Sequence, residues 1–304
     1  MVKNESSLMQ GKALELLRPM AHSGKPPLGD FDEHGQFRKN GRFATGIPLA
    51  IGRWRSKLRI MAAVELYDRF FGGEGNPPLV ILHGLLGSSR NWNAAGRDLT
   101  EAYAVTALDQ RNHGQSPQTE SHTYPDLAED LETWLDSQGL ESVSLMGHSM
   151  GGKAGMVFAC SRPERVQALF IADISPREYD PHYDVYLRAM QAIDVHSLTQ
   201  RKEAETELAA TVPDWAMRQF LLTNLVRDAE AGGFRWQVNI PTLLRELPDL
   251  SANPLGPEDR FPGPTLFLKG GKSDFIHEND RAKIREHFPQ SHLVTLKEAG
   301  HNVH

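Results

Sequence analysis

A serine between two glycines, Gly147-His-Ser-Met-Gly151, constrains this chain more than any other feature. A short apolar run, Val143–Met146, precedes it, and a run with helical composition, Met150–Cys160, follows it. In a strand, tight turn and helix of this kind, the serine hydroxyl stands exposed on a strained turn and the helix N-terminus points at it. Glycine is required beside such a turn because a Cβ atom would clash there. The pattern therefore predicts that Ser149 is a nucleophile.

The order of the other motifs supports this interpretation, since a bare G-x-S-x-G is also typical of an ordinary glycine-rich turn. A buried-strand signal, Leu79–Leu82, is followed at once by His83-Gly-Leu-Leu-Gly87. Another strand-like run, His292–Leu296, is followed by Ala299-Gly-His301. An oxyanion loop, a serine, acid candidates and a histidine thus occur in the order that the α/β-hydrolase fold requires. We predict a serine hydrolase of that fold.

Apolar runs alternate with helical patterns through much of the chain, which predicts an α/β fold whose mostly parallel sheet carries helices on both faces. A first strand or hairpin arm is expected at Ile60–Tyr67. Further strands are expected at 79–82, 104–108, 143–146, 168–172, 265–268 and 292–296, and helices at about 88–99, 125–137, 150–161 and 280–287.

The alternation stops between residues 177 and 260, where we find helical patterns, such as 185–190 and 216–225, and no clear strand. We expect this segment to be a helical lid inserted after strand six of the core, and residues 59–176 and 261–304 to form that core. The sequence ends at His304, where the fold normally continues into a final helix. That helix is apparently missing, which suggests a truncated gene product or a surface covered by the N-terminal segment.

Residues 1–58 form a basic, loosely ordered leader or targeting segment in our interpretation. Residues 1–60 hold 11 lysines and arginines and 5 acidic residues, whereas the whole chain has a net charge of −6. The acidic body argues against nucleic acid as a partner, and no apolar stretch approaches the roughly 18 residues of a membrane span. A single cysteine, Cys160, fits a reducing compartment. We expect an intracellular protein, cytoplasmic or organellar; protein partners are not indicated.

Three positions carry the predicted chemistry. A serine hydroxyl needs an adjacent base, and His301 is our candidate, with His304 as a competitor in the frayed end. The acid is open at this point, because Asp173 and Asp274 both follow strands at the same edge of the sheet. Either carboxylate could orient the imidazole and stabilise its charged form.

The oxyanion hole requires two backbone N–H groups, for which we expect Met150 and Leu85. His83 and the cluster Asp109–Ser116 are interpreted as structural hydrogen-bonding groups rather than as catalysts. The histidines show no metal-ligand spacing, and no phosphate-binding glycine motif is present. We therefore expect no cofactor and no metal.

Several longer motifs are similar to those of abhydrolase domain-containing protein 11 and its bacterial esterase relatives. They are His83–Trp92, Asp109–Pro117, Gly147–Lys153, Asp173–Pro176, Phe220–Val226, Phe234–Asn239 and Gly263–Leu268. The resemblance runs from about Leu79 to His304 and covers both core and lid. It implies a serine carboxylesterase with a small lid that favours short acyl esters.

The resemblance also implies that Asp173 is the acid, with Ser273 as a supporting hydrogen-bonding residue. Asp274 is a departure from the family pattern, which generally has no aspartate after Gly-Gly-x-Ser. Because eukaryotic members are often mitochondrial, a mitochondrial or plastid location of this chain is compatible with the basic leader.

Three functions compete. The first is hydrolysis of small-molecule carboxylic esters through an acyl-enzyme. The second is other chemistry on the same fold, such as C–C bond hydrolysis or a lyase reaction, which the lid pocket would decide. The third is a non-catalytic ligand-binding protein, against which the complete set of Ser149, Asp173 and His301 argues.

Overall fold

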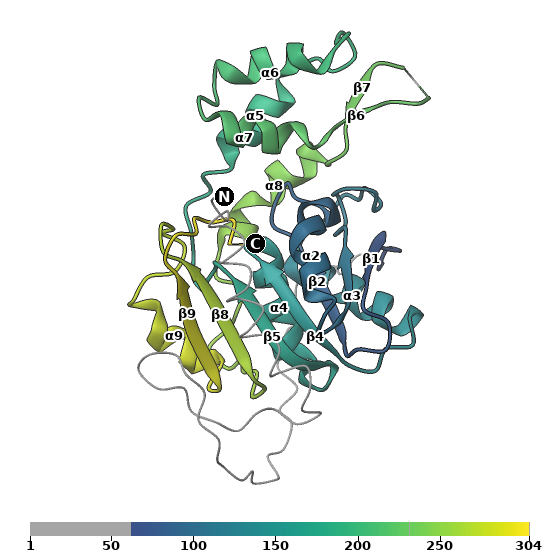
Figure 1. Cartoon of the computed structure of the whole chain (residues 1–304). Coiled ribbons are helices and arrows are strands. Elements are labelled where there is room, and N and C mark those ends of the chain that lie inside the picture. The colour runs from purple at the N-terminus through teal and green to yellow at the C-terminus, as the bar shows by residue number, and fades with distance from the viewer. Residues whose placement is uncertain (1–61, 231, 304) are drawn as a thin grey trace, which may run out of the picture.

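The computed structural model describes residues 62–230 and 232–303. The predicted leader, residues 1–58, lies outside the described residues, as does the competing His304. In the part of the chain that is described, a sheet forms the centre of the molecule and a group of helices stacks over one end of it, at the top of Figure 1.

The sheet contains seven strands in the described residues, in the order β1-β3-β2-β4-β5-β8-β9. Only the pairing of β1 with β3 is antiparallel. The strands are β1 (Asp68–Gly72), β2 (Pro78–Leu82), β3 (Ala104–Leu108), β4 (Val143–His148), β5 (Val166–Ala172), β8 (Thr265–Gly270) and β9 (Ser291–Leu296). The predicted fold class, a mostly parallel sheet with helices, is therefore confirmed.

The sheet is buried on both faces because alternate side chains of its strands enter two apolar layers. On β2, for example, Val80 and Leu82 belong to one layer and Leu79 and Ile81 to the other. The first layer includes side chains of α3, α4 and α9, and the second includes Leu99 of α2. These helices are α2 (Asn93–Leu99), α3 (Tyr124–Ser137), α4 (Met150–Ser161) and α9 (Asp280–His287). Two short 3-10 helices accompany them: η1 (Ser89–Trp92) precedes α2, and η2 (Pro163–Arg165) precedes β5.

The register brings the carboxyl ends of the central strands to one edge. Leu82 of β2 pairs with Gly147 of β4, and Gly147 pairs with Ile171 of β5. The loops after these strands therefore meet, and they are the loops that contain His83–Gly87, Ser149 and Asp173.

The segment between β5 and β8 forms the stack of helices over this edge (Figure 1). It contains α5 (Asp184–Gln191), α6 (Arg201–Ala209), α7 (Trp215–Leu222), β6 (Leu225–Arg227), β7 (Phe234–Trp236) and α8 (Ile240–Ser251). Two of these helices begin at polar caps: the Asp214 side chain accepts from Met217 N–H in α7, and the Asn239 side chain accepts from Thr242 N–H in α8.

Two details differ from the sequence-based expectations. Residues 62–67 form no strand, and the first described strand is β1; five described strands precede the insertion, which we expected after strand six. The inserted segment also contains the antiparallel pair β6–β7, although we expected helices alone. Each of these two strands has three residues, which is too short to show an alternating pattern.

Candidate active site

Ser149 occupies a strained turn between β4 and α4. Its backbone has φ 51° and ψ −117°, a conformation that residues other than glycine rarely adopt. The turn brings backbone segments into direct contact: a Cβ atom at Gly147 would lie 2.2 Å from the Gly151 carbonyl oxygen, and one at Gly151 would lie 2.4 Å from that of Leu82. The two glycines are therefore required, as the sequence predicts, and the surrounding packing holds Ser149 at the N-terminus of α4.

Asp173 lies directly after β5 and contacts the imidazole of His301. Its Oδ2 atom is 2.8 Å from His301 Nδ1, and its Oδ1 atom accepts a hydrogen bond from Gly270 N–H at 2.8 Å. The Ser273 hydroxyl also donates to Oδ2. Asp173 is fully buried and has a left-handed backbone, with φ 50°. The structure thus brings Asp173, Ser273 and His301 together.

Asp274, the alternative acid, is exposed to solvent. Its carbonyl oxygen accepts a hydrogen bond from Arg177 Nη2 at 3.2 Å. The contact with His301 is made by Asp173, on the neighbouring strand.

His301 is held from several directions. Its ring stacks on that of Phe275, with centroids 3.7 Å apart and 19° between the planes. Its carbonyl oxygen lies 2.9 Å from Nε2 of His148, the residue next to Ser149. Its own Nε2 atom is buried and has no hydrogen-bond partner among the described residues. That is the atom through which a general base would act on a serine, and such bonds often tighten only when substrate binds.

The loop after β2 approaches the serine closely. A Cβ atom at Gly84 would lie 3.3 Å from the Cβ of Ser149. The next residue, Leu85, lines a pocket with Ser149 and Met150. Met150 is the first residue of α4, so its N–H has no acceptor within the helix. The two predicted oxyanion donors, Leu85 and Met150, thus belong to the same pocket as Ser149.

Two buried histidines, His83 and His113, contact this loop, and a third, His122, contacts Met150. The hydrogen-bond pattern makes His83 a donor at Nδ1, to Gly84 O at 2.8 Å, and an acceptor at Nε2, from Gln110 N–H at 3.0 Å. His113 accepts from Leu86 N–H at 3.1 Å. His122 Nε2 is 3.4 Å from Met150 Sδ.

Burial lowers the pKa of His83 and of His113, and burial together with Arg111 lowers the pKa of His122 to about 3. All three rings are therefore neutral at physiological pH, which is the state that the acceptor roles of His83 and His113 require.

The cluster that begins at Asp109 braces the same region. The Asp109 carboxylate accepts from Ser89 N–H at 2.6 Å and from Gln115 N–H at 2.8 Å. Arg111 is fully buried and forms a bidentate ion pair with Asp130, with both N–O distances at 2.6 Å. These contacts agree with the structural role that we expected for the cluster.

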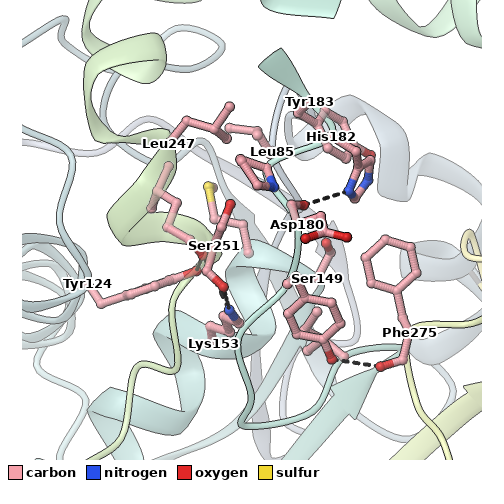
Figure 2. Close-up of a pocket in the computed structure, with 15 residues that line it drawn as sticks. Leu85, Tyr124, Ser149, Lys153, Asp180, His182, Tyr183, Leu247, Ser251 and Phe275 are labelled. Carbon is pink, nitrogen blue, oxygen red and sulfur yellow. Dashed lines mark hydrogen bonds between the residues drawn. The ribbon is translucent and has the colours of Figure 1, made fainter. Parts of the chain in front are cut away.

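The pocket beside Ser149 has mainly apolar walls, which core and inserted segment share (Figure 2). The lining residues are Leu85, Tyr124, Ser149, Met150, Lys153, Ile174, Tyr179, Asp180, Pro181, His182, Tyr183, Leu247, Leu250, Ser251 and Phe275. The sequence reasoning did not single out Lys153, Tyr179 or Phe275. Only Lys153 lay within a quoted motif, one helical turn after Ser149.

Lys153 connects the serine-bearing helix to the inserted segment. Its Nζ donates to the carbonyl oxygens of Leu250, Ser251 and Ala252 at 3.3, 3.0 and 2.6 Å (Figure 2 shows the bond to Ser251). These carbonyls end α8, where the helix dipole is negative and favours a cation. Burial, and secondarily the Arg177 guanidinium, lowers the pKa of Lys153 to about 7.

The described residues contain no group of three or more histidine, cysteine or acidic side chains that could hold a metal ion. Across the same residues, no helix is both long enough and apolar enough to cross a bilayer.

The fold and this site define a class. The chain belongs to the alpha/beta hydrolase fold family, whose model matches residues 77–304.

Its relatives narrow the class to esterases and lipases. The chain is 39% identical over 248 residues to the sn-1-specific diacylglycerol lipase ABHD11 of Mus musculus, covering 78% of this chain and 79% of that protein. It is 33% identical over 233 residues to esterase YbfF of Escherichia coli strain K12, covering 75% and 87%. Among solved structures, a marine microorganism esterase superposes with a TM-score of 0.76 at 39% identity, covering 79% and 93%. The resemblance inferred from the motifs is therefore confirmed.

Proposed function

We propose that this protein is a serine carboxylesterase that hydrolyses short-chain acyl esters through an acyl-enzyme intermediate. The observation that carries the proposal is the arrangement of His301, whose Nδ1 is bonded to the buried Asp173 at 2.8 Å while its Nε2 is buried and free of any partner among the described residues. His301 also contacts His148, the residue before Ser149, and a base oriented by a carboxylate next to a serine on a strained turn is the arrangement that activates a hydroxyl nucleophile.

In the proposed reaction, the Ser149 oxygen attacks the ester carbonyl carbon while His301 Nε2 takes the hydroxyl proton. The N–H groups of Leu85 and Met150 stabilise the negative oxygen of the tetrahedral intermediate. Its collapse breaks the bond to the alcohol, which leaves with the proton from His301. Water, activated by the same imidazole, then hydrolyses the acyl-serine. Asp173 stays ionised and stabilises the imidazolium, and Ser273 and Gly270 hold its carboxylate in place.

We assign residues 59–176 and 261–304 to the catalytic core and 177–260 to the lid. The lid contributes Leu247 and Leu250 of α8 and the segment Tyr179–Tyr183 to the walls of the pocket. Apolar walls suit the hydrocarbon part of an ester. The small lid and the likeness to esterases support acyl chains of about two to six carbons, with binding set mainly by hydrophobic burial of about 0.8 kcal/mol per methylene.

A fluorophosphonate probe and an ester panel test this function. The probe should label the protein, and peptide mapping should place the adduct on Ser149. In the panel, p-nitrophenyl esters of two to six carbons should give a higher kcat/KM than those of twelve to sixteen. The panel should include a diacylglycerol, because the Mus musculus relative is named a diacylglycerol lipase. Higher kcat/KM for long chains or for diacylglycerol would reject the short-chain assignment, and absence of labelling would reject the serine mechanism.

A further inference from the structure

The lid makes a polar contact with the loop that carries the predicted oxyanion donor. Asn224, which lies between α7 and β6, donates from Nδ2 to the Leu86 carbonyl oxygen at 2.9 Å. Both residues are buried, with Asn224 3% exposed and Leu86 0%. A buried hydrogen bond between groups 138 residues apart in sequence joins the lid to this loop directly.

Leu86 needs such support because its backbone is left-handed, with φ 61°. For a residue with a Cβ atom this conformation costs about 1–2 kcal/mol. Its N–H donates to His113 in the core, at 3.1 Å, and its carbonyl accepts from Asn224 in the lid. The core and the lid therefore each hold one polar group of this residue.

The peptide between Gly84 and Leu85 carries the predicted oxyanion donor, Leu85 N–H, and lies one residue before Leu86. The carbonyl of that peptide, Gly84 O, accepts from His83 Nδ1 at 2.8 Å and from Gly87 N–H at 2.9 Å. The position of the Leu85 N–H is thus set on one side by bonds within the core and on the other by the conformation of Leu86.

The backbone of Asn224 is already held within the lid. Its N–H donates to Leu221 O at 3.1 Å, and its carbonyl accepts from Gln237 N–H at 2.8 Å. The side chain also donates within the lid, to Leu221 O at 3.3 Å, and its shorter bond to Leu86 is an addition to this internal structure.

We propose that Asn224 is a positioning residue of the oxyanion hole, through which the docked lid holds Leu86 and so aims the Leu85 N–H at the reacting carbonyl. The lid then contributes to transition-state stabilisation as well as to the pocket wall. This inference rests on the proposed function, because it assigns Asn224 to the oxyanion hole of that reaction.

The test compares Asn224→Ala and Asn224→Asp with the unaltered protein. Both variants remove the N–H donor, and the aspartate keeps the shape of the side chain. On p-nitrophenyl butyrate we expect kcat/KM to fall by about 10–100-fold, mostly in kcat, a smaller loss than the roughly 10²–10³-fold for deleting a donor itself. The inhibition constant of a trifluoromethyl ketone, whose adduct places an oxyanion in the hole, should rise by a similar factor.

Asn239→Ala is the matched control. Asn239 is also a lid asparagine that donates to core groups, the Thr119 carbonyl at 3.0 Å and the Asn112 side chain at 3.1 Å, but it does not touch the oxyanion loop. This variant should lose thermal stability while keeping kcat and the ketone inhibition constant within about threefold. Equal losses in the Asn224 and Asn239 variants would show that lid docking in general is responsible and would overturn the proposal.

Hydrogen exchange supplies a measurement that does not depend on ester hydrolysis. Exchange of the peptide covering residues 83–88 should accelerate in the Asn224 variants and remain unchanged in Asn239→Ala. Unchanged exchange, or a loss of kcat without weaker ketone binding, would overturn the positioning role. If the unaltered protein shows no labelling and no esterase activity, the proposed function fails, and accelerated exchange still supports the contact that holds the loop.

Discussion

The imidazole of His301 lies flat against the ring of Phe275, with centroids 3.7 Å apart and 19° between the ring planes. Phe275 is itself fixed, because its carbonyl oxygen accepts a hydrogen bond from Tyr179 at 2.6 Å. This stack restricts rotation of the imidazole and presents an aromatic face to it, which favours a cation.

We therefore expect Phe275→Ala to lower kcat. An aromatic face contributes about 1–2 kcal/mol to a partly desolvated cation, which corresponds to roughly a five- to thirtyfold loss. Phe275→Tyr keeps the stack and should keep kcat within about twofold. Because Phe275 also lines the pocket, steady-state kinetics must separate kcat from KM. A change in KM alone would mean that Phe275 acts only as a wall of the pocket.

Ser149→Ala should abolish both fluorophosphonate labelling and hydrolysis of p-nitrophenyl butyrate. Removing a nucleophile that acts with a base lowers turnover by about 10⁴-fold or more. Circular dichroism and thermal melting should show an intact fold, because alanine adds no atoms to the turn. Residual activity above about a tenth of that of the unaltered protein would reject this assignment.

The two acid candidates differ in their contacts with His301. We expect Asp173→Asn to lower kcat by about 10³–10⁴-fold, since the base loses its orienting carboxylate. Asp274→Asn should change kcat by less than about tenfold, because Asp274 is exposed and its described contact is made by its backbone. Both variants should be measured on the same ester. A severe loss in Asp274→Asn would reverse the assignment.

The buried histidines predict acid sensitivity. The pKa values of His83, His113 and His122 are lowered below 6.5 in the folded protein, so the unfolded chain takes up protons first as the pH falls. Their contribution to stability is therefore present above about pH 6.5 and is lost below it, by up to about 1.4 kcal/mol per pH unit for each histidine. Urea denaturation between pH 7 and pH 5 measures this slope.

His122→Asn removes one of these groups and should make the slope shallower by up to about 1.4 kcal/mol per pH unit. His196→Asn, at an exposed position, is the control and should leave the slope unchanged. Identical slopes in all three proteins would contradict a part for His122 in the acid sensitivity.

The sequence predicted the elements whose signals are local and strong. Three elements have the expected bounds: the helices Met150–Ser161 and Asp280–His287 and the strand Ala104–Leu108. The first strand was predicted too early in the chain, because the run Ile60–Tyr67 has the apolar composition of a strand. The observed strand, Asp68–Gly72, is partly exposed and lacks a clear pattern.

Site residues that act across the fold were harder to find. Asp173 and Asp274 occupy equivalent places after strands, and spacing along the chain does not reveal which carboxylate turns toward His301. The left-handed backbone of Asp173 and its bond to Gly270 make that difference, and both depend on the packed sheet. Three further residues of the site, Phe275, Lys153 and Asn224, belong to residue types that are common in protein cores and on protein surfaces. Only their contacts in the folded protein distinguish them from ordinary core or surface residues.

The three carbonyl bonds of Lys153 have a consequence for how small molecules reach and leave Ser149. They tie the end of α8 to the helix that starts at the serine, and Tyr124 adds a fourth bond, to Leu250 O at 2.8 Å. The side of the pocket formed by Lys153, Tyr124 and Leu250 is therefore buried in the protein. The segment Asp180–His182, which also lines the pocket, is exposed to solvent. We therefore expect substrate and product to travel past that segment, and bulky side chains introduced there to slow turnover without disturbing the chemistry.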